Sequence, residues 1–110
     1  MDITYDDFAK IDLRVGTIVE VEDFSEARKP AYKLKIDLGE LGIKNSSAQI
    51  VSAYPNQQEL IGKQVVCVVN LGNKRIGSFV SDVLTTGFDT EDGVVLATVD
   101  RKVENGKRLF

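Results

Sequence analysis

The ten residues LRVGTIVEVE at positions 13–22 decide the fold class, because apolar side chains recur along them at every second position. This is the period of a β-strand with one buried face and one wet face. Gly16 within the strand predicts a bulge or a sharp coil at that point. The buried face is expected to carry Leu13, Val15, Thr17, Val19 and Val21, which would leave Ile18 on the wet face with Arg14, Glu20 and Glu22.

Further strands follow this first one. Tyr32–Leu38 alternates in the same way and carries Lys33 and Lys35 on its wet face. Residues 44–51 form a weaker strand, and residues 64–71 are so apolar that both of their faces should be buried. Residues 79–88 and 94–99 predict two more strands around a turn at 89–93, whereas 72–77 reads as a turn.

Two short helices complete the pattern. Thr4 and Asp7 form a capping-box signature that predicts an N-terminal helix, docked through Tyr5 and Phe8. Asn56 and Gly62 bound a second compact helix between the third and fourth strands. Five barrel strands with a helix in that place is the order of the OB-fold, an all-β barrel that binds oligonucleotides or other extended ligands. The expected fold is thus a five-stranded barrel with an N-terminal helix and a C-terminal strand extension.

The length and the residue types narrow the function. A chain of 110 residues is the length of one domain, residues 1–110. It has no histidine and one cysteine, Cys67, which we expect to be an inert buried thiol, so we predict a binding module rather than an enzyme, with no metal and no cofactor. Without a signal peptide, an internal disulfide or a membrane-spanning run, the expected location is the cytoplasm, with no membrane insertion.

The net charge of −3 hides an uneven distribution. Acidic residues dominate positions 1–26, and basic residues outnumber acidic ones over positions 27–88. Five cations of the chain are predicted to share one face of the barrel and form a patch that attracts phosphate: Arg14, Lys33, Lys35, Lys74 and Arg75. Scattered, solvated lysines remain the alternative.

Several ordered segments resemble one known family. They are Asp12–Ile18, Lys35–Glu40, Gln49–Ser52, Glu59–Val66, and Val69–Leu71 followed by Lys74–Gly77 and Ser81. Together they are similar to the tRNA-binding domains that are appended to some aminoacyl-tRNA synthetases and that also occur as free dimers. The stretches 24–34, 52–54 and 81–84 depart from the tRNA-binding pattern in a way that resembles the CsaA-like branch.

This resemblance implies a function and partners. CsaA-like proteins are homodimeric export chaperones that bind unfolded precursor proteins and the preprotein translocase ATPase. The alternative that the family allows is a tRNA-binding accessory protein. The candidate ligand-binding residues, for peptide or tRNA, lie on the predicted basic face, the loop 25–31 and the flanking strands: Arg14, Arg28, Lys29, Tyr32, Lys33, Lys35, Ser52, Tyr54, Asn70, Lys74 and Arg75. Tyr32 and Tyr54 are expected to offer flat contact area.

Overall fold

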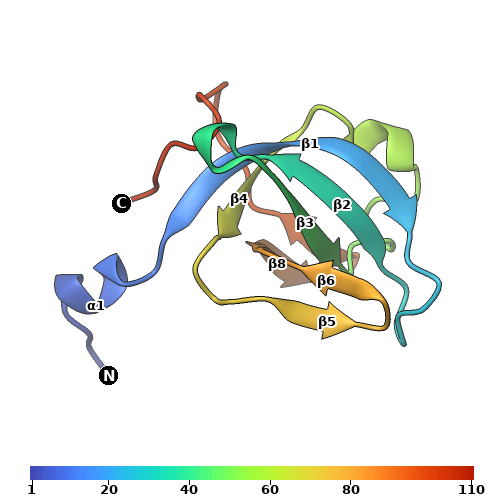
Figure 1. Ribbon diagram of the computed structural model, residues 1–110, viewed down its shortest axis with the longest axis horizontal. Helices are drawn as coiled ribbons and strands as arrows, with labels where there is room; N and C mark the ends of the chain where they lie inside the picture. Colours follow the sequence, from blue (N-terminus) through green and yellow to red (C-terminus); the bar gives the residue numbers. More distant parts are fainter.

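The computed structural model describes all residues 1–110, and at its centre an antiparallel sheet of order β3-β2-β1-β4-β7 curls into a nearly closed barrel (Figure 1). The barrel strands are β1 (Leu13–Asp23), β2 (Tyr32–Asp37), β3 (Ile43–Ala48), β4 (Gln64–Val68) and β7 (Leu84–Thr85). Two 3₁₀ helices, η1 (Gly39–Leu41) and η2 (Gln57–Leu60), lie between these strands. The all-β OB-type barrel, with its short helix between β3 and β4, is confirmed.

The core fills the inside of the barrel. Its side chains include Ile18, Leu34, Ile36 and Val65, all essentially without solvent exposure. Gly16 allows β1 and β2 to approach closely here, because a β-carbon at that position would lie 2.6 Å from Cγ2 of Ile36. Tyr32, Leu34 and Ile36 are all buried, so the predicted alternation of apolar residues in β2 is confirmed.

The predicted faces of β1 were wrong at Ile18 and Val19 but right beyond them, where Val21 packs against the core and Glu20 and Glu22 are exposed. The pairing of β1 with β2 shifts between Ile18 and Glu20, so the bulge lies at Val19 rather than at Gly16. A one-residue slip exchanges the two faces of a strand. Ile18 is consequently buried in the core, and Val19 is 42% exposed.

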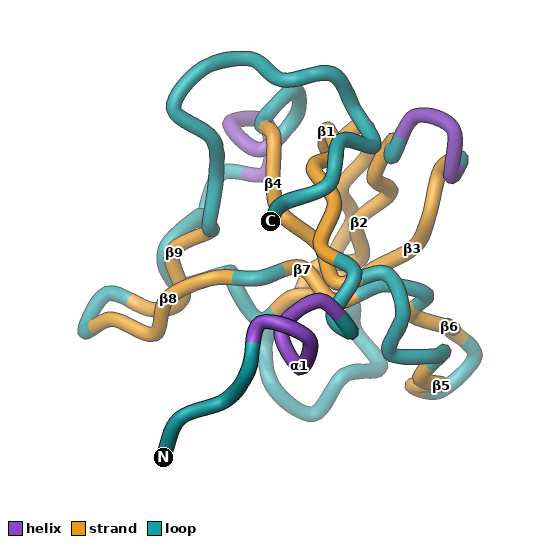
Figure 2. The backbone as a smooth tube through the Cα atoms, turned by 90° about the vertical axis from the view of Figure 1, so that its left-hand side faces the viewer, coloured by secondary structure: helices purple, strands orange, loops and turns teal.

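Two small hairpins stand beside the barrel (Figure 2). The first joins β5 (Lys74–Ile76) to β6 (Phe79–Ser81), and the second joins β8 (Gly87–Thr90) to β9 (Gly93–Leu96). The sequence reading of 72–77 as one turn was therefore wrong, because Lys74 and Arg75 lie in a strand. The single strand predicted for 79–88 was wrong too, since it is divided into β6, β7 and β8.

The C-terminal segment of the chain runs back along β1. Two of its bonds hold it there, with Gly106 N–H donating to Val15 O and Leu109 N–H donating to Leu13 O.

The helix α1 (Tyr5–Ala9) has the predicted capping box but lies apart from the barrel (Figure 1). It buries no residue, and Tyr5 is 67% exposed, so the predicted docking of its aromatic face is not found within one chain.

Candidate functional site

Where β3 meets residues 81–85 the barrel closes without a strand ladder. The N–H groups of Asp82 and Val83 both donate to Asn45 O, and side chains make the other bonds. We call this side of the barrel the seam. Asn45 N–H donates to Oδ2 of Asp82 at 3.0 Å, and Ser47 N–H donates to Oγ of Ser81 at 3.2 Å. Inside the barrel, Oγ1 of Thr85 donates to Oγ of Ser46 at 2.8 Å. The seam is tied at its Asn45 end and loses these bonds beyond Ser47.

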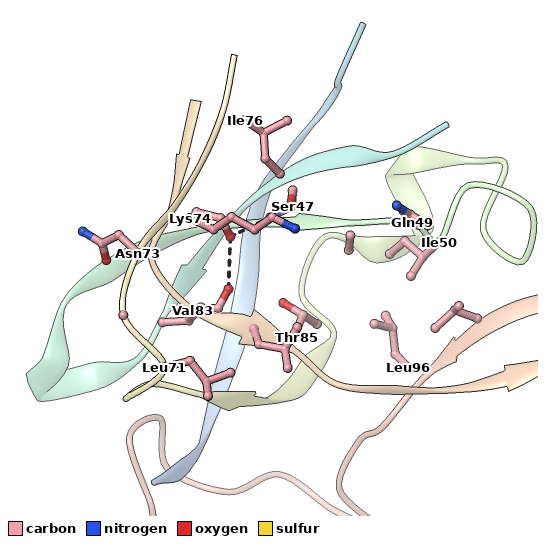
Figure 3. A pocket seen from close by; sticks show the side chains of 15 residues that line it. Ser47, Gln49, Ile50, Leu71, Asn73, Lys74, Ile76, Val83, Thr85 and Leu96 are labelled. Carbon is pink, nitrogen blue, oxygen red and sulfur yellow. Dashed lines mark hydrogen bonds between the residues drawn. The ribbon is translucent and has the colours of Figure 1, made fainter. Parts of the chain in front are cut away.

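A groove of about 480 Å³ opens where those bonds stop (Figure 3). One wall is the end of β3 and the residues after it, Ser47–Ile50, and the opposite wall comes from residues 83–85 and β9. Residues 71–74 and Ile76 line the remaining side. Eight of the fifteen lining residues are hydrophobic, and Lys74 is the one charged residue among them. Leu71 and Leu84 are 66% and 49% exposed, so the groove offers apolar contact area to a ligand.

Lys33 and Lys35 do lie together on the outer face of β2, as predicted. Glu22 is paired with Lys33 and Glu20 with Lys35 across the β1–β2 ladder. Opposite charges on facing residues offset each other, so this face is not a purely basic surface. The ammonium of Lys33 lies 5.1 Å from the centre of the Phe24 ring and 5.5 Å from that of Phe79.

Arg14 and Asn70 are taken up by contacts within the chain. The guanidinium of Arg14 donates to both carboxylate oxygens of Asp12 and to Gly106 O, and its bond to Asp12 raises the pKa of Arg14. Asn70 accepts from Asp12 N–H and donates to Lys10 O. Arg14 thus holds the C-terminal segment against the barrel, and Asn70 holds the N-terminal segment.

Tyr32 does not offer the contact area that was predicted for it. Its side chain is buried, its hydroxyl donates to Tyr54 O at 2.7 Å, and burial raises the pKa of Tyr32. Tyr54 is half-buried, and its hydroxyl accepts from Leu96 N–H at 3.1 Å. Tyr54 thus holds the β9 wall of the groove. Ser52, the third candidate in this region, is exposed.

The remaining candidate cations lie in β5 and in the loop after β1. Side chains of neighbouring strand residues point to opposite faces, so Lys74 lines the groove with Ile76 while Arg75 does not. Arg28 and Lys29 are exposed in the loop after β1, which is bonded to the β5–β6 hairpin through Ser78 and Glu26. The predicted single patch of five cations is therefore not formed.

The sequence reasoning missed most of the groove. Of its lining residues only Lys74 was among the candidates, while Leu71, Gln49, Val83 and Leu96 were not. Leu71 and Leu84 carry no motif, and their exposure follows from the way the chain closes around the barrel. The one signal available in the sequence was that Leu71, an apolar residue, stands directly before the turn at Gly72.

The groove lining contains no cysteine, aspartate or glutamate. Cys67 is fully buried, and burial raises its pKa to about 11. No cluster of three or more metal-ligating residues occurs in the chain, and none of its helices has the length and hydropathy that crossing a membrane would need. The lining therefore presents apolar contact area with one charged side chain, Lys74.

Comparison with known proteins agrees with this geometry. Residues 13–108 match the model of a family described as a putative tRNA binding domain. The chain belongs to this tRNA-binding-domain family. The match covers the whole barrel and the C-terminal segment that returns along β1.

Solved structures of the same family include close neighbours. The domain superposes with a TM-score of 0.92 on the CsaA chaperone protein of Picrophilus torridus, which is 53% identical, over 99% of this chain and 100% of that one. The chaperone CsaA of Bacillus anthracis gives the same TM-score at 44% identity, with both chains fully covered. The resemblance to CsaA-like proteins is confirmed.

Sequence relatives include a synthetase. The domain is 36% identical over 110 residues to the methionine–tRNA ligase of Chromobacterium violaceum, covering 97% of this chain. It spans only 16% of that enzyme's length. The similarity is therefore to one part of the enzyme.

Proposed function

We propose that the protein is a homodimeric chaperone of the CsaA type, which binds unfolded or precursor polypeptides for export and catalyses no reaction. The observation that carries the proposal is the apolar groove at the seam, with Leu71 and Leu84 exposed on its sides. An unfolded chain presents apolar side chains that a folded protein hides, and an exposed apolar groove is suited to hold them.

The distribution of charge favours a polypeptide over tRNA as the ligand. Nucleic-acid binding depends on cations that neutralise phosphates. Here Glu20 and Glu22 face Lys35 and Lys33 across the ladder, and Arg14 is bonded to Asp12. The cations left for phosphate, Arg28, Lys29 and Arg75, do not line the groove.

The test is a pair of variants with matched exposure. Leu71→Asp places a charge in the groove, whereas Ile43→Asp places one at a residue that is 60% exposed and does not line it. Both variants should fold, because both side chains are largely exposed. We expect Leu71→Asp to lose suppression of the aggregation of a denatured client, measured by light scattering, and Ile43→Asp to keep it. Equal activity of the two variants would refute the groove as the binding site.

A tRNA-binding accessory role is the second candidate, favoured by the match to the putative tRNA binding domain and by the free charges of Arg28 and Lys29. Changing both residues to Ala should then weaken tRNA binding and reduce its salt dependence. The double variant of Arg101 and Lys102 is the charge-matched control. If tRNA binding is absent in the wild type, or equal in both double variants, this role is refuted for the loop.

Dimer formation is supported by exposed apolar side chains away from the groove. Tyr5, Phe88 and Phe110 are 67%, 64% and 91% exposed, and one self-complementary contact would cover both copies. Light scattering should give about twice the chain mass of 12.1 kDa, and a mass near 12 kDa would refute the dimer. The preprotein translocase ATPase is the proposed partner in the cytoplasm, and its binding can be measured with the purified ATPase.

A further inference from the structure

The backbone of Gln49 is free at the edge of β3. Its N–H and C=O take part in no hydrogen bond within the chain. Gln49 follows Ala48, the last residue of β3, which is paired with Tyr32 of β2. A strand edge with unpaired N–H and C=O groups is a template for a further strand.

The direction of these free groups follows from the bonds of the strand before them. The N–H groups of Asn45 and Ser47 point away from β2, since they donate to Asp82 and Ser81 across the seam. Every second N–H of a strand points to the same side. Gln49 follows β3 directly, so the same alternation directs its N–H across the seam as well. Gln49 lines the groove on that side (Figure 3).

We infer that a bound polypeptide pairs with this edge as an added strand, with one of its residues exchanging two hydrogen bonds with Gln49. The inference rests on the proposed function and specifies how the groove holds its ligand. Strand addition takes its affinity from main-chain bonds and its selectivity from alternate side chains. It thus suits a protein that must accept many unrelated sequences.

The same pairing defines which polypeptides fit. Residues that face each other across a ladder carry their side chains on the same side of the sheet. The ligand residue opposite Gln49 therefore points outward, and its two neighbours point the way Ala48 and Ile50 do, toward Val83 and Leu96 of the groove. Lys74, the one charge in the lining, complements an acidic side chain. The ligand is an extended segment with apolar residues at every second position and a nearby Asp or Glu.

The first experiment changes the ligand and leaves the protein intact. A fluorescent nine-residue peptide of alternating Leu and Ser with one Glu is titrated by anisotropy, together with a series in which each backbone amide in turn is methylated. Successive amides of a strand point to opposite sides. Binding should weaken about tenfold for methyl groups on alternate amides only.

The second experiment removes the N–H of the protein. Gln49→Pro deletes this donor, and Ala48 before it already has the extended backbone that a proline requires. Gln49→Ala keeps the backbone and is the control. The Pro variant should bind the unmethylated peptide about tenfold more weakly than the Ala variant does, because the Ala variant keeps the N–H that the Pro variant lacks. Circular dichroism checks that both fold, and the methylated peptides give the result if the Pro variant does not.

Three outcomes would overturn the inference, and they separate it from the proposed function. Normal binding of every methylated peptide leaves the groove as the site but excludes strand pairing. No binding of the unmethylated peptide to the wild type refutes the proposed function as well. Peptide binding that appears only when the protein is diluted to monomers would show that a second copy occupies the edge.

Discussion

Two sides of the barrel enclose the same core by different bonds. One is the ladder side, where β1 pairs with β2 and β4, and the other is the seam between β3 and residues 81–85. On the ladder side, backbone groups bond to backbone groups along eleven-residue β1. At the seam, the connections to β3 are made by the side chains of Ser81, Asp82 and Thr85 together with two backbone bonds to Asn45 O, and beyond Ser47 these bonds end. Where the ladder is complete, the backbone N–H and C=O groups are already paired. The edge that we propose for an extended polypeptide therefore lies where the ladder is incomplete.

The largest effect on stability is expected from the ladder side. Ile36→Ala should lower the free energy of unfolding by about 2–5 kcal/mol, because Ile36 has no exposure and packs in the core against β1. Urea denaturation followed by circular dichroism measures this change. A cost below about 1 kcal/mol would show that the ladder side collapses around the cavity and is no more rigid than the seam.

Cys67 of β4 gives a second measure of the ladder side. Burial raises its pKa from 9.0 to about 11, which makes the thiolate fraction at pH 8 about a hundredfold smaller than in the unfolded chain. Ellman's reagent should react slowly with the native protein and rapidly in urea, and Cys67→Ser gives the background. Native labelling as fast as unfolded labelling would contradict this.

The same shift fixes the direction of one pH effect. The folded chain holds the Cys67 proton more tightly than the unfolded chain, so this contribution to stability is complete below pH 9.0 and is lost as the pH rises toward about 11. Urea midpoints of the wild type should therefore fall more steeply over this range than those of Cys67→Ser. Parallel curves for the two proteins would disprove the shift.

A smaller effect is expected at the seam. Ser81→Ala removes the acceptor of Ser47 N–H and the donor to Val83 O, both at 3.2 Å. The loss should cost about 1–2 kcal/mol, and urea denaturation measures it. Ser25→Ala, at an exposed serine without a partner, is the control and should change stability by less than about 0.5 kcal/mol. If Ser81→Ala costs as much as Ile36→Ala, the contrast between the two sides fails.

The smallest effect on stability is expected inside the groove. Leu71→Ser should change the free energy of unfolding by about 0.5 kcal/mol or less, because this side chain is 66% exposed. Peptide binding by anisotropy should nevertheless fall, since Leu71 lines the groove. A large loss of stability would show that Leu71 supports the barrel rather than a ligand.

Much of the fold was predictable because its signals are local. The alternation of Tyr32, Leu34 and Ile36, the capping box of Thr4 and Asp7, and the Asn56 cap each need only a few neighbouring residues, and all were confirmed. A strand buries every second side chain whatever it pairs with. The sequence by itself therefore determined the first four barrel strands and the resemblance to the family, but not the division of residues 79–88 into separate strands.

The site was decided by contacts between residues far apart in the chain. Arg14 is bonded to Gly106, and Tyr32 is bonded to Tyr54, which removed both from the predicted binding surface. The slip at Val19 exchanged the faces of Ile18 and Val19, and the bonds of Ser81 and Asp82 to β3 divided a predicted strand and left the groove beyond them. Such outcomes depend on which segments meet in three dimensions, and a pattern within one segment carries no information about its partner.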